Sequence, residues 1–240
     1  MNKTRTLTYV WPKSIRLFHW INVITISLLI VIGLIIFNGK TLGVTVDAKI
    51  MLKTIHVTIG YIFAINLIIR LVMGFIGSSN DMWSQTLPFM KGYKKELTKF
   101  RRSPKQVYKG HNPIGKLMVL ALLIAMTIQM ATGLILAGTD IYYPPLGQHF
   151  AKSIAVDETQ LDVIEPYSKV NVDDERYKQL REFRSPIITA HVYAFYALVI
   201  LIPLHILGVI VAERREKSGL VSAMINGYKF LPEKSNNHKT

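Results

Sequence analysis

Residues 187–212 read IITAHVYAFYALVILIPLHILGVIVA, an apolar run that holds two histidines, His191 and His205. Because ~20 helical residues cross the ~30 Å hydrocarbon core of a bilayer, this run predicts a transmembrane span. The 14 residues between the histidines fall only ~40° short of four helical turns, so both rings lie on much the same face, ~21 Å apart along the axis. One span therefore offers two imidazoles, one near each membrane surface.

Three more runs of this kind indicate an all-α protein, a four-helix transmembrane bundle in a single membrane domain, residues 1–240. The spans are expected at 17–37, 54–76, 114–137 and 187–212. The first run is longer than a signal-peptide core, and no small-residue cleavage motif follows it, so we expect it to remain as a span. The chain has no cysteine, which excludes disulfides, iron–sulfur ligation and covalently attached haem.

Basic residues set the expected direction of the spans. Of the 28 Lys and Arg other than Arg70, 19 lie in the two tails, in the connection after the second span, or at Lys116 just inside the third span. This excess places both termini and the tail 213–240 in the cytoplasm. The loop 138–186 has nine acidic and six basic residues, and we expect it to be irregular, acidic and external. The net charge of +14 then reflects topology and not a nucleic-acid surface. Residues 213–230 are expected to form a helix along the cytoplasmic membrane surface.

Depth sorts the four intramembrane histidines into two pairs. His19 opens the first span near the inner surface, and His56 opens the second near the outer surface, so His19 faces His205 and His56 faces His191. Two facing imidazoles are the axial ligands of a six-coordinate, noncovalent haem b, which predicts two haem b (heme b) groups. Zinc or di-iron is disfavoured, since the spans lack carboxylates and two histidines leave zinc two ligands short. A histidine that only hydrogen-bonds a neighbouring helix is the structural alternative at each position.

Three further residues are candidates for cofactor binding. Arg70 follows His56 by 14 residues, so it faces the bundle at the lower pair, where it could neutralise a haem propionate or instead extend to lipid headgroups. Gly33 lies at the depth of the upper pair and Gly60 one turn beyond His56, where a porphyrin edge could approach the backbone. Ordinary helix packing also accounts for such glycines, and for Gly133.

The remaining histidines and the tryptophans receive simpler interpretations. We expect His111 to cap a helix or contact a propionate or quinone, and His149 and His238 to be solvated. Interfacial anchoring is the expected role of Trp11, Trp20 and Trp83.

Four motifs resemble the bacterial cytochrome b561 family: RLFHW (16–20), KTIHVTIG (53–60), GHNPIG (110–115) and the paired histidines of the fourth span. That family includes cytochrome b subunits of membrane nickel–iron hydrogenases and gamma subunits of some formate dehydrogenases. The run SAMINGY (222–228) is similar to the hydrogenase branch in particular. The resemblance covers residues 10–228 except the acidic outer loop.

The resemblance implies a haem bundle in the bacterial inner membrane that passes electrons between quinone or quinol and a redox partner at the membrane surface. Its axial ligands correspond to His19, His56, His191 and His205. The external partner could be a hydrogenase-like dehydrogenase subunit, or a c-type cytochrome whose basic face docks on the acidic loop. We would look for quinone near the lower pair, beside Arg70 and His111.

Two other functions remain open from the sequence. An autonomous quinone-linked oxidoreductase, such as a superoxide oxidase, would need an outer surface that attracts an anion, and the acidic loop opposes this. A non-redox carrier or channel would contain no haem and would be colourless. A hydrolase is disfavoured because no intramembrane carboxylate can orient a Ser–His pair.

Overall fold

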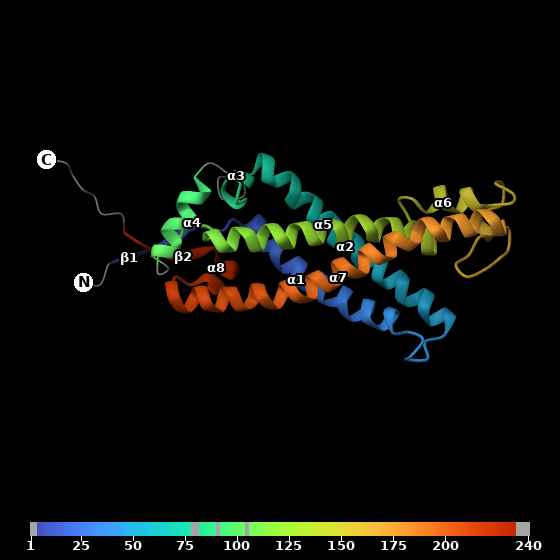
Figure 1. Cartoon of the computed structure of the whole chain (residues 1–240), viewed down its shortest axis with the longest axis horizontal. Coiled ribbons are helices and arrows are strands. Elements are labelled where there is room, and N and C mark those ends of the chain that lie inside the picture. The colour runs from blue at the N-terminus through green and yellow to red at the C-terminus, as the bar shows by residue number, and fades with distance from the viewer. Residues whose placement is uncertain (1–3, 78–81, 90–91, 104–105, 234–240) are drawn as a thin grey trace. The chain divides into compact units, whose positions relative to one another are not determined.

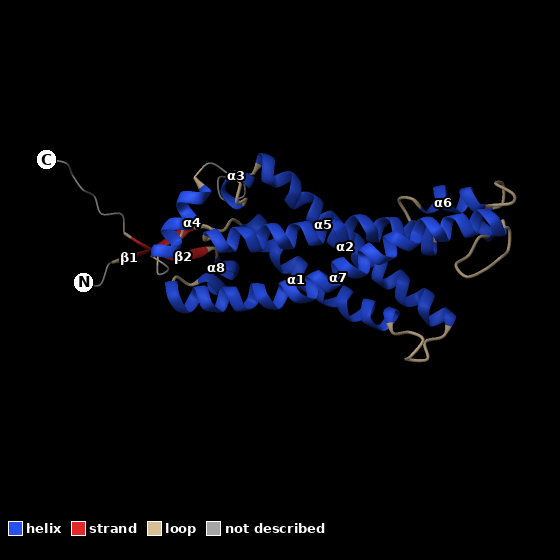
Figure 2. Cartoon of the chain, in the orientation of Figure 1, coloured by secondary structure: helices blue, strands red, loops and turns tan. Residues whose placement is uncertain are grey.

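The computed structural model describes residues 4–77, 82–89, 92–103 and 106–233. Helices make up most of the chain (Figure 2). The elements follow the chain in this order (Figure 1): β1 Arg5–Tyr9, α1 Lys13–Phe37, α2 Val46–Ile76, α3 Trp83–Thr86, α4 Tyr93–Arg102, α5 Pro113–Ile141, α6 Gly147–Ile154, the 3-10 helix η1 Leu161–Val163, α7 Asp174–Glu216, α8 Leu220–Asn226 and β2 Tyr228–Pro232.

Within the described residues, four helices are long and apolar enough to cross a membrane: α1, α2, α5 and α7. Each contains one predicted span, which confirms the all-α, four-span prediction. Large apolar side chains on these helices are exposed, such as Leu17 at 63% and Ile24 at 60%, whereas Asn22 and Asn66 are buried and joined by a 3.2 Å hydrogen bond. Apolar groups outside and paired polar groups inside suit a chain surrounded by lipid.

The chain divides into two compact units. The terminal unit contains residues 1–20, 68–123 and 199–240, and the central unit contains residues 21–67 and 124–198. Each of the four long helices contributes residues to both units.

A two-stranded antiparallel sheet joins the chain ends in the terminal unit. Its register pairs Arg5 with Pro232 and Tyr9 with Tyr228. Val10, Trp11 and Ala223 form a small core beside it.

The prediction of one helix over 213–230 is wrong. α7 ends at Glu216, α8 covers only Leu220–Asn226, and Tyr228–Pro232 is a strand. Backbone φ is positive at Lys217, Gly219 and Gly227, which interrupts helical geometry at each junction. The strand forms because it pairs with β1. Since β1 lies more than 200 residues away along the chain, no local pattern reveals this pairing.

The segment 138–186 of the central unit, which the sequence predicts to be external, is more ordered than the sequence indicated. It contains α6 and η1, and its last residues already belong to α7, which begins at Asp174, thirteen residues before the predicted span. A core holds it together, formed by Ala151, Ile154, Ala155, Ile164 and Leu180. The prediction of an irregular loop is therefore wrong for these parts, because apolar residues spaced among the charged ones build a core of their own.

Asp140 at the end of α5 connects this segment to two other helices. It pairs with Lys53 of α2 and accepts a 2.8 Å hydrogen bond from Arg184 of α7. All three side chains are largely shielded from solvent, so this ion cluster ties the end of α5 to α2 and α7 within the central unit.

Candidate functional site

The central unit brings His56 of α2 and His191 of α7 together. Their ring centroids lie 6.5 Å apart, with an interplanar angle of 67°. Two imidazoles bound on opposite sides of one iron, at ~2 Å per bond, have ring centroids ~6 Å apart. The residues present therefore have the spacing of a bis-imidazole metal site.

Two glycines make room for these rings. A Cβ atom added at Gly33 of α1 would lie 3.4 Å from Cε1 of His56, and one at Gly133 of α5 would lie 3.3 Å from Cε1 of His191. Around Gly60, one turn from His56, there is open space within 4 Å. Larger residues at 33 and 133 would press on the histidines, whereas position 60 leaves space beside them.

Two polar side chains of α5 hold the His191 ring. Its Nδ1 atom lies 2.9 Å from Thr132 Oγ1, and its Nε2 atom lies 2.8 Å from Gln129 Nε2. The Nδ1 atom of His56 is buried and has no hydrogen-bond partner within the described ranges. Sequence reasoning missed Thr132 and Gln129, although two polar residues three positions apart in an apolar span were a usable signal.

The terminal unit contains the other pair. His19 of α1 and His205 of α7 lie within electrostatic range of each other. Among the described residues, Nδ1 of His19 is another buried atom without a hydrogen-bond partner. The neighbouring Trp20 donates a 2.9 Å hydrogen bond to the carbonyl of Met224, which ties the start of α1 to α8 beside His19.

Arg70 is buried in the terminal unit, at 5% exposure. Its guanidinium stacks 4.4 Å from the ring centroid of Trp83 in α3, a cation–π contact. A Cβ atom at Gly74, one turn along α2, would overlap the same ring. Trp83, for which we expected interfacial anchoring, thus packs against α2 and covers Arg70.

His111 packs against Trp11, which is itself only 6% exposed, with ring centroids 4.8 Å apart. Burial, together with the cationic Lys229 and Arg70 nearby, lowers the pKa of His111 to about 3, so the ring is neutral at pH 7. The helix cap is its neighbour Asn112, whose Oδ1 accepts a 2.7 Å hydrogen bond from the Gly115 N–H.

A buried polar cluster lies near His111. Lys229 of β2 is fully buried and donates a 2.7 Å hydrogen bond to the Tyr108 carbonyl, and burial lowers its pKa. Glu216, 3% exposed, accepts from Asn112 at 3.5 Å. Sequence reasoning missed this cluster, since its lysine sits on the unpredicted strand.

Two further histidines, His149 and His238, were expected to be solvated. His149 is exposed on α6, and His238 lies outside the described residues. Across the part of the chain that the structure describes, His, Asp and Glu form no group of three or more suited to a metal ion.

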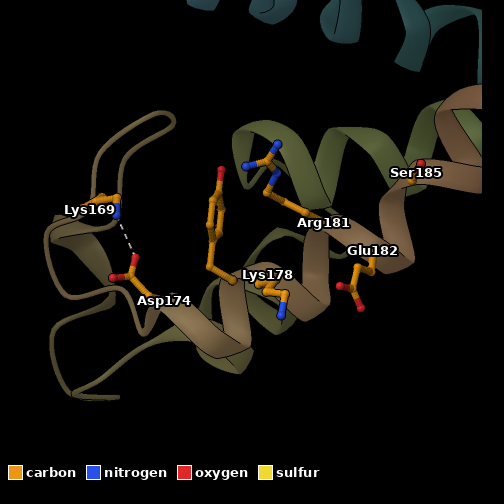
Figure 3. A pocket seen from close by; sticks show the side chains of 7 residues that line it. Lys169, Asp174, Lys178, Arg181, Glu182 and Ser185 are labelled. Atoms are coloured by element: carbon orange, nitrogen blue, oxygen red, sulfur yellow. Dashed lines mark hydrogen bonds and ion pairs between the residues drawn. The ribbon is translucent and has the colours of Figure 1, made fainter.

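A groove at the start of α7 carries both signs of charge (Figure 3). Lys169 and Asp174 are joined across it at 2.9 Å. The other lining residues are Tyr177, Lys178, Arg181, Glu182 and Ser185. This part of the segment 138–186 is therefore not a uniformly acidic surface.

Comparison with known proteins shows the family to which this chain is related. The family model described as prokaryotic cytochrome b561 matches residues 10–227. A probable Ni/Fe-hydrogenase B-type cytochrome subunit of Rhodobacter capsulatus is 23% identical over 96% of this chain and 84% of its own length. A protein of the same name from Rhizobium leguminosarum bv. viciae is 25% identical over 96% of this chain and 92% of its own length. Another from Azotobacter vinelandii is 28% identical over 61% of this chain and 64% of its own length. No solved structure matches significantly.

The chain belongs to the prokaryotic cytochrome b561 family. It is accordingly a multi-pass membrane protein of electron transfer that binds haem b.

Proposed function

We propose that the chain binds two haem b groups, one between His56 and His191 and the other between His19 and His205. The observation that carries this proposal is the 6.5 Å separation of the His56 and His191 rings, which suits two axial ligands of one iron. The buried, unpartnered Nδ1 atoms of His56 and His19, both within the described residues, give further support, because buried polar atoms ordinarily have a partner.

Each pair would hold one haem by its imidazoles, without a covalent attachment. A bound haem supplies an iron that gains or loses one electron at a time. The chain's own residues set the environment of that iron. Gly33 and Gly133 leave room at the histidine rings, and buried Arg70 places a cation in the terminal unit where a propionate would need one.

We place the quinone site in the terminal unit, beside Arg70 and His111. His111 is neutral at pH 7 and Arg70 is charged, so the two offer a polar N–H group and a guanidinium to the carbonyl oxygens of a quinone. The buried carboxyl of Glu216 and the ammonium of Lys229 lie in the same unit and provide groups that can exchange protons with such a ligand.

The cellular setting follows from charge and from the relatives. The excess of Lys and Arg in the tails favours cytoplasmic termini in the inner membrane of a bacterium. The relatives are named as hydrogenase subunits, so we propose a hydrogenase-like dehydrogenase subunit as the redox partner at the external face. The mixed charge of the groove near Lys169 supports this partner over a c-type cytochrome, whose basic face would need a more uniformly acidic surface.

Quinol-driven haem reduction tests the quinone site. Arg70→Gln and His111→Gln should each slow reduction by a soluble quinol at least tenfold, while dithionite still produces the full reduced spectrum. Lys94→Gln is the matched control, because Lys94 is an exposed cation on α4 and its loss should leave the rate unchanged. Unchanged quinol kinetics in both test variants would remove the quinone site from this region.

A further inference from the structure

The hydroxyl of Thr132 fixes the position of a proton on His191. Its Oγ1 atom lies 2.7 Å from the carbonyl of Ile128 and 2.9 Å from Nδ1 of His191. A hydroxyl has one hydrogen to donate, and a carbonyl can only accept. Two carbonyls of its own helix lie within reach of the hydroxyl, those of Ile128 at 2.7 Å and Gln129 at 3.2 Å, and we assign the hydrogen to the nearer one. With that assignment, Thr132 Oγ1 accepts a hydrogen bond from the Nδ1–H of His191.

The other ring nitrogen agrees with this assignment. Gln129 places its side-chain nitrogen 2.8 Å from Nε2 of His191, and an amide nitrogen can only donate. In this orientation of the amide, Nε2 of His191 presents its lone pair, and Gln129 Oε1 is buried without a hydrogen-bond partner among the described residues. Gln129 and Thr132 are three residues apart on α5, hence on one face, and together they leave the ring with its proton on Nδ1 and its lone pair on Nε2.

The opposite histidine lacks such support. Among the described residues, Nδ1 of His56 is buried without a hydrogen-bond partner, and Gly33, which faces this ring, has no side chain to offer one. The two histidines of this pair are thus chemically unequal, although each lies within an apolar membrane-spanning helix, α2 or α7.

We infer that Thr132 is a positioning residue that prepares His191 as the stronger iron ligand of the pair. This inference rests on the proposed haem site. By accepting the hydrogen bond from Nδ1–H, Thr132 orients the ring and raises the basicity of Nε2. A haem held by this nitrogen would be stabilised in its ferric state and would have a lower reduction potential. Without haem, the Gln129 amide occupies the Nε2 lone pair, and it would have to leave this position for His191 to hold a haem.

Two substitutions separate the hydrogen bond from the space that Thr132 fills. Thr132→Val removes the acceptor at almost constant volume, and Thr132→Ser keeps the hydroxyl. In a spectroelectrochemical titration of the purified protein, Thr132→Val should shift the midpoint of one haem upward, or release that haem, and leave the other unchanged. Thr132→Ser should behave as the wild type.

Thr58→Val is the matched control. Thr58 is exposed two residues from His56, and its hydroxyl donates a 2.8 Å hydrogen bond to the Thr54 carbonyl of its own helix, so both midpoints should stay at their wild-type values. Wild-type midpoints in Thr132→Val, or an equal shift in Thr132→Ser, would overturn the inference.

A second measurement works without haem. In ¹⁵N-histidine spectra of the haem-free chain, one ring with its proton on Nδ1 should be present in the wild type and in Thr132→Ser, and altered in Thr132→Val. An unaltered ring in Thr132→Val contradicts the hydrogen-bond role. A preparation that never takes up haem but shows this change refutes the haem proposal and leaves the tautomer assignment standing.

Discussion

Burial changes the charge state of one residue, His111, strongly enough to predict a pH effect. Its pKa falls from 6.5 to about 3, with burial as the main cause. Between these values the unfolded chain takes up a proton that the folded chain does not, so the free energy of unfolding decreases by ~1.4 kcal/mol for each pH unit below 6.5. Above pH 6.5 this contribution is complete.

The expected result is a melting temperature that falls between pH 6.5 and 4, with a smaller fall in His111→Gln. His149→Gln, which changes an exposed histidine on α6, should keep the wild-type slope. Circular dichroism melts in detergent at several pH values provide the measurement. Identical slopes in all three proteins would show that His111 is protonated as readily in the fold as outside it.

Among single residues, those that could be predicted are the polar or ionisable ones within apolar membrane spans. Histidines in apolar runs stand out, and helix direction and depth alone pair His56 with His191, whose rings do lie together in the fold. Thr132 and Gln129 gave only a weaker signal, two polar residues in one apolar span, because a threonine that bonds its own helix is common there and costs little. The role of Thr132 depends on a neighbouring helix, and sequence spacing does not report that contact.

Among the elements, the sheet β1–β2 depends on the tight turn at Gly227. Its φ of +91° disfavours any side chain, and a Cβ atom there would overlap the ring of Tyr9. Gly227→Ala should therefore lower the free energy of unfolding by ~1–3 kcal/mol. The terminal unit also holds His19, so the variant should release the haem proposed for that unit at a lower temperature than wild type.

Gly110→Ala is the control, because space is open around Gly110 and its φ is ordinary. Circular dichroism melts and the temperature dependence of the haem spectrum check both statements. Equal melting temperatures of Gly227→Ala and Gly110→Ala would mean that the turn at Gly227 accommodates a side chain without loss of folding free energy.

Elements that depend on nearby residues could be predicted from the sequence, whereas elements that depend on contacts with distant residues could not. Four helices follow from apolar length alone, since in lipid the backbone must satisfy its own hydrogen bonds. The start of α7 at Asp174 was missed because Asp174–Pro186 is charged and lies outside the apolar run, and packing of Leu180 against α6 stabilises it. The strands were missed because each depends on a partner at the opposite end of the chain.

At the scale of the whole molecule, each compact unit contains one complete histidine pair: His56 and His191 in the central unit, His19 and His205 in the terminal unit. The net charge of +14, which in a soluble protein would suggest nucleic acid, belongs here to the tails and the connections of a membrane protein. Family membership adds electron transfer and haem b.

The haem-to-protein ratio of the purified chain, taken from its reduced-minus-oxidised spectrum, tests the central claim most directly. We predict a b-type alpha band and two haems per chain. His56→Ala and His191→Ala should each leave the same single haem, and His19→Ala and His205→Ala the other. A spectrum without a b-type band, or a wild-type ratio of one, would contradict the two-haem assignment.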